Sequence, residues 1–265
     1  MVVINLPNWE AFENKVASLY RGLKRRREAT RIGMSPLFFR GQACDSWKLQ
    51  TTLERYSSKD FTVEEYYQVM LRVLPAVQSY TEKAWGLPYP CPETESIPMV
   101  PHGYEFMVYL RHHRFPSPLL DWSRSPYVAA FFAFEASPTM NGNVAIFAYV
   151  EYIGGAKFSH PEEPRIVGCG PYVASHKRHF NQQSAYTVCR KQVNNEYYYC
   201  SHEDAFVRNN LTEDLLIKYV IPRSERDKVL EKLHLMNITA YSLFGSEDSL
   251  METLAFEEID QRGRR

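Results

Sequence analysis

Two short stretches of the chain place charged side chains among apolar and aromatic neighbours. Residues 39–42 read Phe-Arg-Gly-Gln, and residues 112–123 read His-His-Arg-Phe-Pro-Ser-Pro-Leu-Leu-Asp-Trp-Ser. Burying an unpaired ion costs several kcal/mol, so these charges need partners in the protein or in a ligand. The two stretches are therefore the first candidates for a site that binds a ligand or catalyses a reaction.

Arg40 brings a planar, permanently charged guanidinium that suits bidentate contact with a phosphate or a carboxylate. Gly41 follows it and has no side chain, so a ligand could approach the backbone closely there. Asp121 lies between apolar residues and could cap a helix, pair with Arg40 or stabilise a developing cation. The residue types leave two interpretations open: Arg40 binds a ligand, or it forms a buried ion pair with Asp121.

His112 and His113 end a predicted helix, where the helix dipole favours a cationic imidazole. One of the two must point inward, either as a core or capping histidine or as an acid–base catalyst. A third polar cluster begins at Arg178 and leads into a predicted strand. Gln182 in this cluster could read a ligand through its amide, or it could make ordinary hydrogen bonds between loop and strand.

Several well-known catalytic motifs are absent from the sequence. It contains no Walker phosphate-binding loop, no Gly-x-Gly-x-x-Gly, no Gly-x-Ser-x-Gly and no His-Glu-x-x-His. Their absence argues against a P-loop NTPase, a Rossmann dehydrogenase, an α/β-hydrolase and a zincin. The five cysteines include no Cys-x-x-Cys pair, so we expect reduced, mostly structural thiols and no metal.

The composition narrows the class of protein further. Among 265 residues, 31 basic and 31 acidic side chains give a net charge of zero, which does not favour a general nucleic-acid coat or a membrane-surface protein. No apolar run approaches the roughly 20 residues of a membrane span, and no signal peptide is visible. We therefore expect a cytoplasmic protein without membrane contact. The 18 Tyr, 15 Phe and 4 Trp supply core residues and also stacking surface for a cleft.

The spacing of apolar residues predicts a mixture of helices and strands. Helices are predicted at residues 8–27, 62–77, 104–113, 125–134 and 224–235 and from about residue 249. Strands are predicted at residues 37–39, 144–150, 185–189 and 215–221. The two kinds of element do not alternate regularly, which favours an α+β fold with a mixed or antiparallel sheet over a doubly wound parallel sheet. No repeat or composition shift marks a second domain, so residues 1–265 are predicted to form one domain.

Local signals define several helix ends. Thr62 with Glu65 predicts a capping box, and so does Ser249 with Glu252 for the last helix. Ser125 is the predicted N-cap of a helix whose first position is a proline.

Two kinds of segment have a distinctive composition. Residues 85–103 carry five prolines, so we predict a long ordered loop or lid there. The basic run Lys24–Arg27 and the basic tail 261–265 are either solvated or available to phosphates.

Four blocks of the sequence, in the same order, resemble the FRG domain family, which is named for its first motif. The matching residues are Phe39, Arg40, Gly41 and Gln42 with Trp47, Leu49, Leu53 and Arg55; His112, Pro116, Leu119, Leu120, Asp121 and Trp122; Arg178 and Gln182; and residues 243–250. The resemblance covers most of the chain and implies one FRG domain over residues 1–265.

The sequence departs from the family pattern at several positions. Arg111 stands where the family has Gln, Arg114 stands where it has Gly, and Ser117-Pro118 replaces a Thr-Arg pair. The loss of that second Arg removes a phosphate contact that the family pattern would suggest. In the third block, Ser184 and Tyr186 replace Gly and Phe.

The resemblance also implies a function. FRG proteins often look like components of bacterial defence or toxin–antitoxin systems, and their Arg on a first strand resembles the start of ADP-ribosyltransferases of the Arg-Ser-Glu type. By that resemblance Arg40 holds NAD through a phosphate, and Ser117 or Ser123 supports the nicotinamide ribose. A carboxylate then stabilises an oxocarbenium-like state as nicotinamide leaves. The candidates for this carboxylate are Asp121, Glu247 and Glu252.

We therefore expect an FRG domain protein that binds NAD in a cleft and transfers ADP-ribose to RNA, DNA or protein, or hydrolyses NAD. An antitoxin or immunity protein is an expected partner. The expected catalytic residues are Arg40, His112 and Asp121. The expected NAD-binding residues are Arg40, Gly41, Ser117, Trp122, Ser123, Arg178 and Gln182.

Two other functions stay open at this point. The same cleft could belong to a non-catalytic module that senses a nucleotide or another ligand, with Arg40 and Asp121 as a structural ion pair. A phosphodiester nuclease that uses the histidines is a third and weaker alternative.

Overall fold

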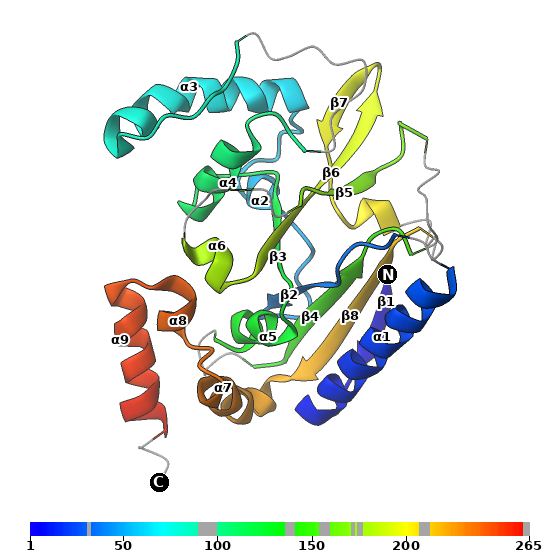
Figure 1. Ribbon diagram of the computed structural model, residues 1–265, viewed down its shortest axis with the longest axis vertical. Coiled ribbons are helices and arrows are strands. Elements are labelled where there is room, and N and C mark those ends of the chain that lie inside the picture. The colour runs from blue at the N-terminus through cyan, green and yellow to red at the C-terminus, as the bar shows by residue number, and fades with distance from the viewer. Residues whose placement is uncertain are drawn as a thin grey trace.

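A mixed β-sheet forms the centre of the computed structural model, which describes residues 1–30, 33–89, 100–135, 141–153, 160–170, 173, 177–206 and 213–261 (Figure 1). Its strands in these ranges are β1 (Val2–Asn5), β2 (Phe38–Gln42), β3 (Leu120–Ser123), β4 (Asn143–Val150), β5 (Arg165–Gly168), β6 (Ser184–Val193), β7 (Glu196–Tyr199) and β8 (Leu215–Pro222). Their order is β1-β8-β4-β2-β3-β6-β5, and β7 pairs with β6. β1 and β8 are parallel, and the other pairs are antiparallel.

Helices cover this sheet. They are α1 (Trp9–Thr30), α2 (Thr52–Tyr56), α3 (Val63–Thr81), α4 (Tyr104–His112), α5 (Pro126–Phe134), α6 (Lys177–Asn181), α7 (Arg226–Leu235), α8 (Ala240–Phe244) and α9 (Glu247–Ala255). Short 3-10 turns lie at Asp204–Phe206 and Arg223–Glu225, and a π-helical turn over Phe256–Gln261 follows α9. In Figure 1, α1, α5 and α7 lie beside β4 and β8, and α3 and α4 lie toward β6 and β7.

Strand β4 shows how the sheet divides the core. Its even-numbered residues, from Val144 to Val150, pack against α1, α5 and α7, and its odd-numbered residues, from Ala145 to Tyr149, pack on the opposite face. The cluster on that opposite face also contains Ala185 and Cys189 of β6. The alternate residues of β6 pack against α3 and α4. Two groups of helices therefore cover the same face of the sheet over different strands.

The fold class and many elements agree with the sequence-based predictions. The α+β fold is confirmed, as are the predicted helices at 8–27 and 104–113 and the strands around 144–150 and 215–221. Thr62 and Glu65 form the predicted capping box at the start of α3. Ser125 caps α5 by accepting a hydrogen bond from the backbone of Val128.

Two local predictions differ from the structure. Asp121 lies on a strand, β3, that was not predicted, because four residues are too few to show a period. The last helix is capped by Ser246 with Ser249, so the predicted capping box of Ser249 with Glu252 is wrong. Since α9 begins at Glu247, Glu252 belongs to its interior.

Parts of two predicted segments lie outside the described residues. These are residues 90–99 of the predicted proline-rich loop and residues 262–265 of the predicted basic tail. Among the described helices, none combines the length and the apolar character that crossing a membrane requires.

Candidate ligand-binding cleft

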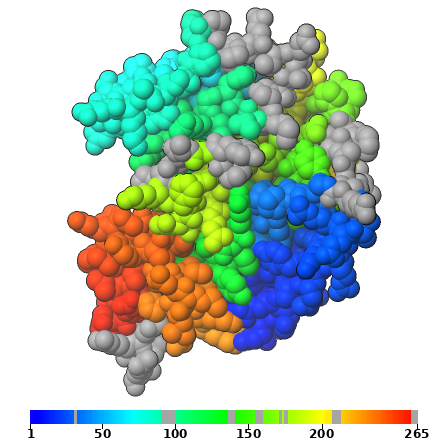
Figure 2. Space-filling model, viewed as in Figure 1, coloured from blue at the N-terminus to red at the C-terminus, as the bar shows by residue number. Residues whose placement is uncertain are grey.

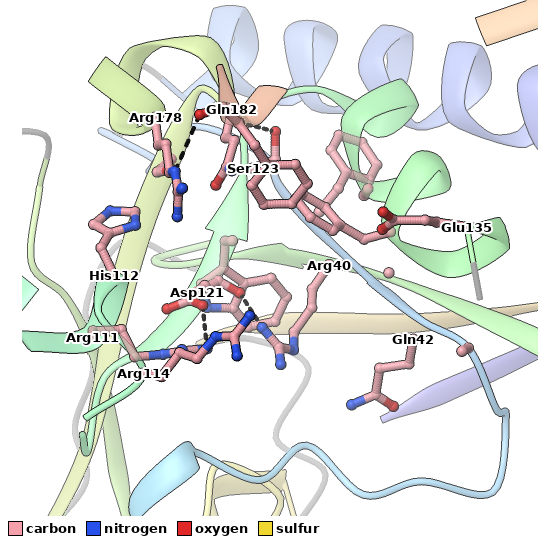
Figure 3. Close-up of a pocket in the computed structure, with 18 of the residues that line it drawn as sticks. Arg40, Gln42, Arg111, His112, Arg114, Asp121, Ser123, Glu135, Arg178 and Gln182 are labelled. Atoms are coloured by element: carbon pink, nitrogen blue, oxygen red, sulfur yellow. Dashed lines mark hydrogen bonds and ion pairs between the residues drawn. The ribbon is translucent and has the colours of Figure 1, made fainter. Parts of the chain in front are cut away.

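The pairing between β2 and β3 is confined to one position in the centre of the sheet. Phe39 is opposite Ser123. On their other edges, all of β2 pairs with β4 and all of β3 pairs with β6. A cleft of about 850 Å³ opens here, lined by residues of both strands and of α4, α5, α6, α8 and α9 (Figure 3). The cleft therefore lies between the two groups of helices.

The outer wall of this cleft comes from the C-terminal part of the chain. Phe244 of α8 and Asp248, Ser249 and Glu252 of α9 line it. Figure 2 shows these helices, in orange and red, gathered on one side of the molecule next to the yellow-green α6. The site thus combines segments that are more than 200 residues apart in sequence, from Arg40 to Glu252.

Gly41 has a structural reason to be glycine. A Cβ atom at this position would lie 2.7 Å from the backbone nitrogen of Ala133, and closer still to the carbonyl oxygen of Ala129. Its absence lets α5 pack directly on β2. Gly41 lines the cleft, but its missing side chain makes room for a helix.

Arg40 reaches from β2 to β3. Its Nη1 atom donates a hydrogen bond to the backbone carbonyl oxygen of Asp121 at 2.8 Å, and its buried Nε has no partner among the described residues. Burial lowers the pKa of the guanidinium to about 10; Asp121 opposes this shift, and Arg111 and Arg55 add to it. Arg40 therefore stays cationic at neutral pH, and its Nε is a buried donor that the described residues leave unpaired.

The Asp121 carboxylate is paired with Arg111 of α4. Its Oδ2 atom accepts a hydrogen bond from Nη2 of Arg111, and its Oδ1 atom has no partner among the described residues. One interpretation of the sequence was an ion pair between the side chains of Arg40 and Asp121. In the structure, the Arg40 side chain instead contacts the backbone of Asp121. In the sequence, Arg111 stood out only because it differs from the family pattern, which has Gln at this position.

His112 is the inward-facing histidine of the pair that ends α4. Its Nε2 atom lies 2.7 Å from the hydroxyl of Tyr186, and Nδ1 of His179 lies 3.4 Å from the same hydroxyl. Burial lowers the pKa of His179 and raises that of Tyr186. His112 and Tyr186 line the cleft, whereas His113 is exposed.

Arg178, Gln182 and Ser123 line the cleft and hold its wall together. Nε of Arg178 donates to the carbonyl of Phe244, and the Gln182 amide donates to the carbonyl of Leu243, each at 3.3 Å. The Ser123 hydroxyl donates to the Gln182 carbonyl at 2.7 Å. These bonds join β3 and α6 to α8, so part of the hydrogen-bonding capacity of Arg178 and Gln182 is used within the protein.

Two other predicted NAD-binding residues take different positions. Ser117 is fully buried and is not among the cleft-lining residues; its hydroxyl accepts a hydrogen bond from the backbone of Leu119. Trp122 lines the cleft but is 3% exposed, donates to the Thr187 hydroxyl and stacks on Tyr149. Of the two predicted ribose-binding serines, Ser123 is the one at the cleft.

A pair of carboxylates also belongs to the cleft lining. Glu135 at the end of α5 and Glu252 of α9 both line the cleft, whereas Glu247 does not. Burial and the neighbouring Glu252 raise the pKa of Glu135 to about 7. Sequence reasoning missed Glu135, although a carboxylate directly after a helix that is apolar all round was the available signal.

Comparison with known proteins identifies one matching family model. No curated protein and no solved structure matches the chain. One family model matches residues 35–141, a segment that holds Arg40, Arg111, His112, Asp121 and Glu135. That model describes the FRG domain, so the chain carries an FRG domain over these residues.

Proposed function

We propose that the cleft binds NAD and that the protein transfers ADP-ribose to a macromolecule or hydrolyses NAD. The observation that carries this proposal is the surplus of positive charge around Asp121. Arg40, Arg55 and Arg111 line the cleft near this carboxylate, and Nε of Arg40 is a buried donor without a described partner. A diphosphate would supply the missing acceptor oxygens and negative charge.

The two carboxylates of the cleft, Glu135 and Glu252, suit the nicotinamide end of the same ligand. The nicotinamide ring of NAD is cationic, and charge develops on the ribose as nicotinamide leaves. Glu135 and Glu252 can stabilise that charge electrostatically when they are ionised. Phe132 and Phe244 also line the cleft and offer aromatic surface for stacking. One elongated ligand with an anionic centre and a cationic end would match both the arginines near Asp121 and the two carboxylates.

The proposal also covers the acceptor of ADP-ribose and the biological role of the protein. RNA, DNA and protein are candidate acceptors, and a role in bacterial defence or as a toxin with an antitoxin partner follows from the FRG resemblance. Arg40, His112 and Asp121 are the proposed catalytic residues, with Glu135 added from the structure.

Label transfer from radiolabelled NAD into a bacterial lysate tests the proposal. Wild type would be compared with Arg40→Ala, and Arg72→Ala on the exposed face of α3 is a matched loss of one arginine away from the cleft. Label in a protein, RNA or DNA fraction with wild type and Arg72→Ala, but not with Arg40→Ala, supports a transferase and identifies the acceptor class. Label only in free ADP-ribose indicates an NAD glycohydrolase.

A second function is a module that binds a nucleotide or another ligand without turnover. The observation in its favour is that Asp121 is already paired with Arg111 and that Arg40 donates to a backbone carbonyl, so both residues have structural partners. Binding of NAD by the folded protein, measured by calorimetry, with no product in any fraction would favour this module over the enzyme.

A further inference from the structure

Two cysteines face each other across the hairpin formed by β6 and β7. Arg190 is paired with Tyr199 in this hairpin, so the next position brings Cys189 opposite Cys200. The backbone nitrogen of Cys200 donates to the carbonyl oxygen of Cys189 at 3.0 Å, and the two Sγ atoms are 3.4 Å apart. Both thiols are reduced in this structure.

This geometry suits a disulfide. Directly opposed residues in a hydrogen-bonded antiparallel pair have Cα atoms about 5.5 Å apart, which is the separation most disulfides show. The Sγ atoms need to approach by roughly 1.4 Å to reach a bond of about 2.0 Å. Rotation of the two side chains can supply most of this movement, because the backbone separation already fits.

The two thiols differ in their access to solvent. Cys189 is 1% exposed in the core, whereas Cys200 is partly exposed at the end of the hairpin. An oxidant therefore reaches Cys200 first, and Cys189 lies behind it as the second thiol. This arrangement of one accessible and one resolving cysteine is typical of reversible oxidation.

We propose that Cys189 and Cys200 are a site of reversible disulfide formation by a peroxide. The Cys200 thiolate attacks one peroxide oxygen, the O–O bond breaks, and the released hydroxide takes up a proton to form water. Cys189 then attacks the Cys200 sulfur of the sulfenic acid, and the S–O bond breaks as the S–S bond forms. The second hydroxide leaves as water with the Cys189 proton. Two thiols and one hydrogen peroxide thus give one disulfide and two waters, and a dithiol reductant reverses the change.

The disulfide would restrain a segment that supports the cleft. Cys200 precedes His202, whose Nε2 lies 2.8 Å from the Thr187 hydroxyl, and that hydroxyl accepts a hydrogen bond from Trp122. Glu203 accepts a hydrogen bond from the backbone nitrogen of Leu49 at 2.9 Å, next to Lys48 in the cleft wall. Oxidation would therefore fix the segment after β7 against the floor and one wall of the cleft.

Peptide mapping by mass spectrometry tests the proposal on the full chain. The reduced protein is treated with limiting hydrogen peroxide, its free thiols are alkylated, and the digest is searched for cross-linked peptides. We expect a Cys189–Cys200 cross-link, a fall from five to three alkylated cysteines, and recovery of all five after dithiothreitol. Cys200→Ser removes the cross-link, whereas Cys44→Ser and Cys91→Ser retain it.

Hydrogen exchange on the same samples tests the effect on the cleft. The amide of Leu49 should exchange several-fold more slowly in the oxidised protein, because its acceptor Glu203 is held more tightly. The amides of α7 serve as an internal control and should not change. A cross-link of Cys200 to any other cysteine, or oxidation of Cys44 with no Cys189–Cys200 cross-link, would overturn the proposal.

Discussion

Arg40 and Asp121 are joined by a hydrogen bond from the guanidinium Nη1 to a backbone carbonyl, at the position where β2 and β3 stop pairing. The bond joins β2 to β3 and leaves the Asp121 carboxylate to Arg111. Arg40 and Asp121 therefore each have a structural partner and also a buried polar atom without a partner among the described residues, Nε in Arg40 and Oδ1 in Asp121.

Replacing Arg40 by Lys should separate ligand binding from folding. Lys keeps the charge but loses the forked donor geometry, and a hydrogen bond to a charged group contributes about 1.5–3 kcal/mol. We expect NAD-dependent turnover, or NAD affinity in the binding-module case, to fall by roughly 10- to 100-fold, with a change of no more than about 1 kcal/mol in the free energy of unfolding. Label transfer and urea titration measure the two effects, with Arg72→Lys as the control.

The opposite pattern would identify Arg40 as a structural residue. In that case Arg40→Lys lowers the unfolding midpoint substantially, and any NAD affinity per folded molecule stays as in the wild type.

Removing the Asp121 charge should cost more stability than removing the charge of Arg111. Asp121→Asn leaves Arg40 and Arg111 without their neutralising carboxylate, whereas Arg111→Gln leaves Asp121 with two arginines, Arg40 and Arg55, still nearby. The pair is partly exposed, so we expect a coupling of about 1–2 kcal/mol in a double-mutant cycle. Urea unfolding of both single variants and the double variant measures it. Equal losses in the two single variants would contradict this account of the charge cluster.

The sequence predicted which residues lie together better than it predicted their contacts. Arg40, His112, Asp121, Arg178 and Gln182 all line one cleft, because the motifs that contain them end at the same region of the sheet. The choice of Arg111 as the partner of Asp121 could not be predicted, since it depends on how the end of α4 meets a four-residue strand. Local patterns carry no information about such long-range packing.

Glu135 and Glu252 also show how far local sequence patterns can predict the site. Glu252 was one of the candidate carboxylates and lines the cleft. A three-residue error in the N-cap of the last helix, Ser249 in place of Ser246, had also assigned it to a capping box. Glu135 follows a helix that is apolar all round, and such a sequence does not show which side of the helix its end faces. That side is set by the packing of α5 on β2.

Gly41→Ala should disrupt the packing of α5 on β2. The added Cβ would meet backbone atoms of Ala129 and Ala133, which cannot rotate away as a side chain can. We expect a loss of about 3 kcal/mol or more, or failure to fold, which is typical of overpacking against rigid neighbours. Gly22→Ala is the matched control, because nothing lies within 4 Å of a Cβ atom there and Gly22 is in the interior of α1.

The control variant should gain about 0.5–1 kcal/mol, since Ala favours the helix over Gly. Urea titration of both variants measures these changes. A Gly41→Ala protein within about 1 kcal/mol of wild type would show that α5 can move without cost.

Glu135→Gln should change how stability depends on pH. The folded protein holds the Glu135 proton up to a pKa of about 7, whereas the unfolded chain releases it near 4.5. Between these values the folded state binds more protons, so the Glu135 contribution to stability is complete below 4.5 and is lost as the pH rises through 7. Gln stays neutral throughout. The variant should therefore match wild type near pH 4.5 and be more stable at pH 8, by on the order of 1–3 kcal/mol.

Urea titrations of both proteins at several pH values measure this difference, and Glu252→Gln provides the second arm. Because Glu252 contributes to the raised pKa of Glu135, its removal should shift the pH dependence to lower pH without abolishing it. A gain from Glu135→Gln that is the same at pH 5 and pH 8 would mean that Glu135 titrates like an exposed carboxyl.

If Glu135 stabilises a cationic ligand, NAD binding or turnover should also rise as the pH increases through 7, because only the ionised carboxylate attracts that charge. Glu135→Gln should remove this rise while leaving the protein folded.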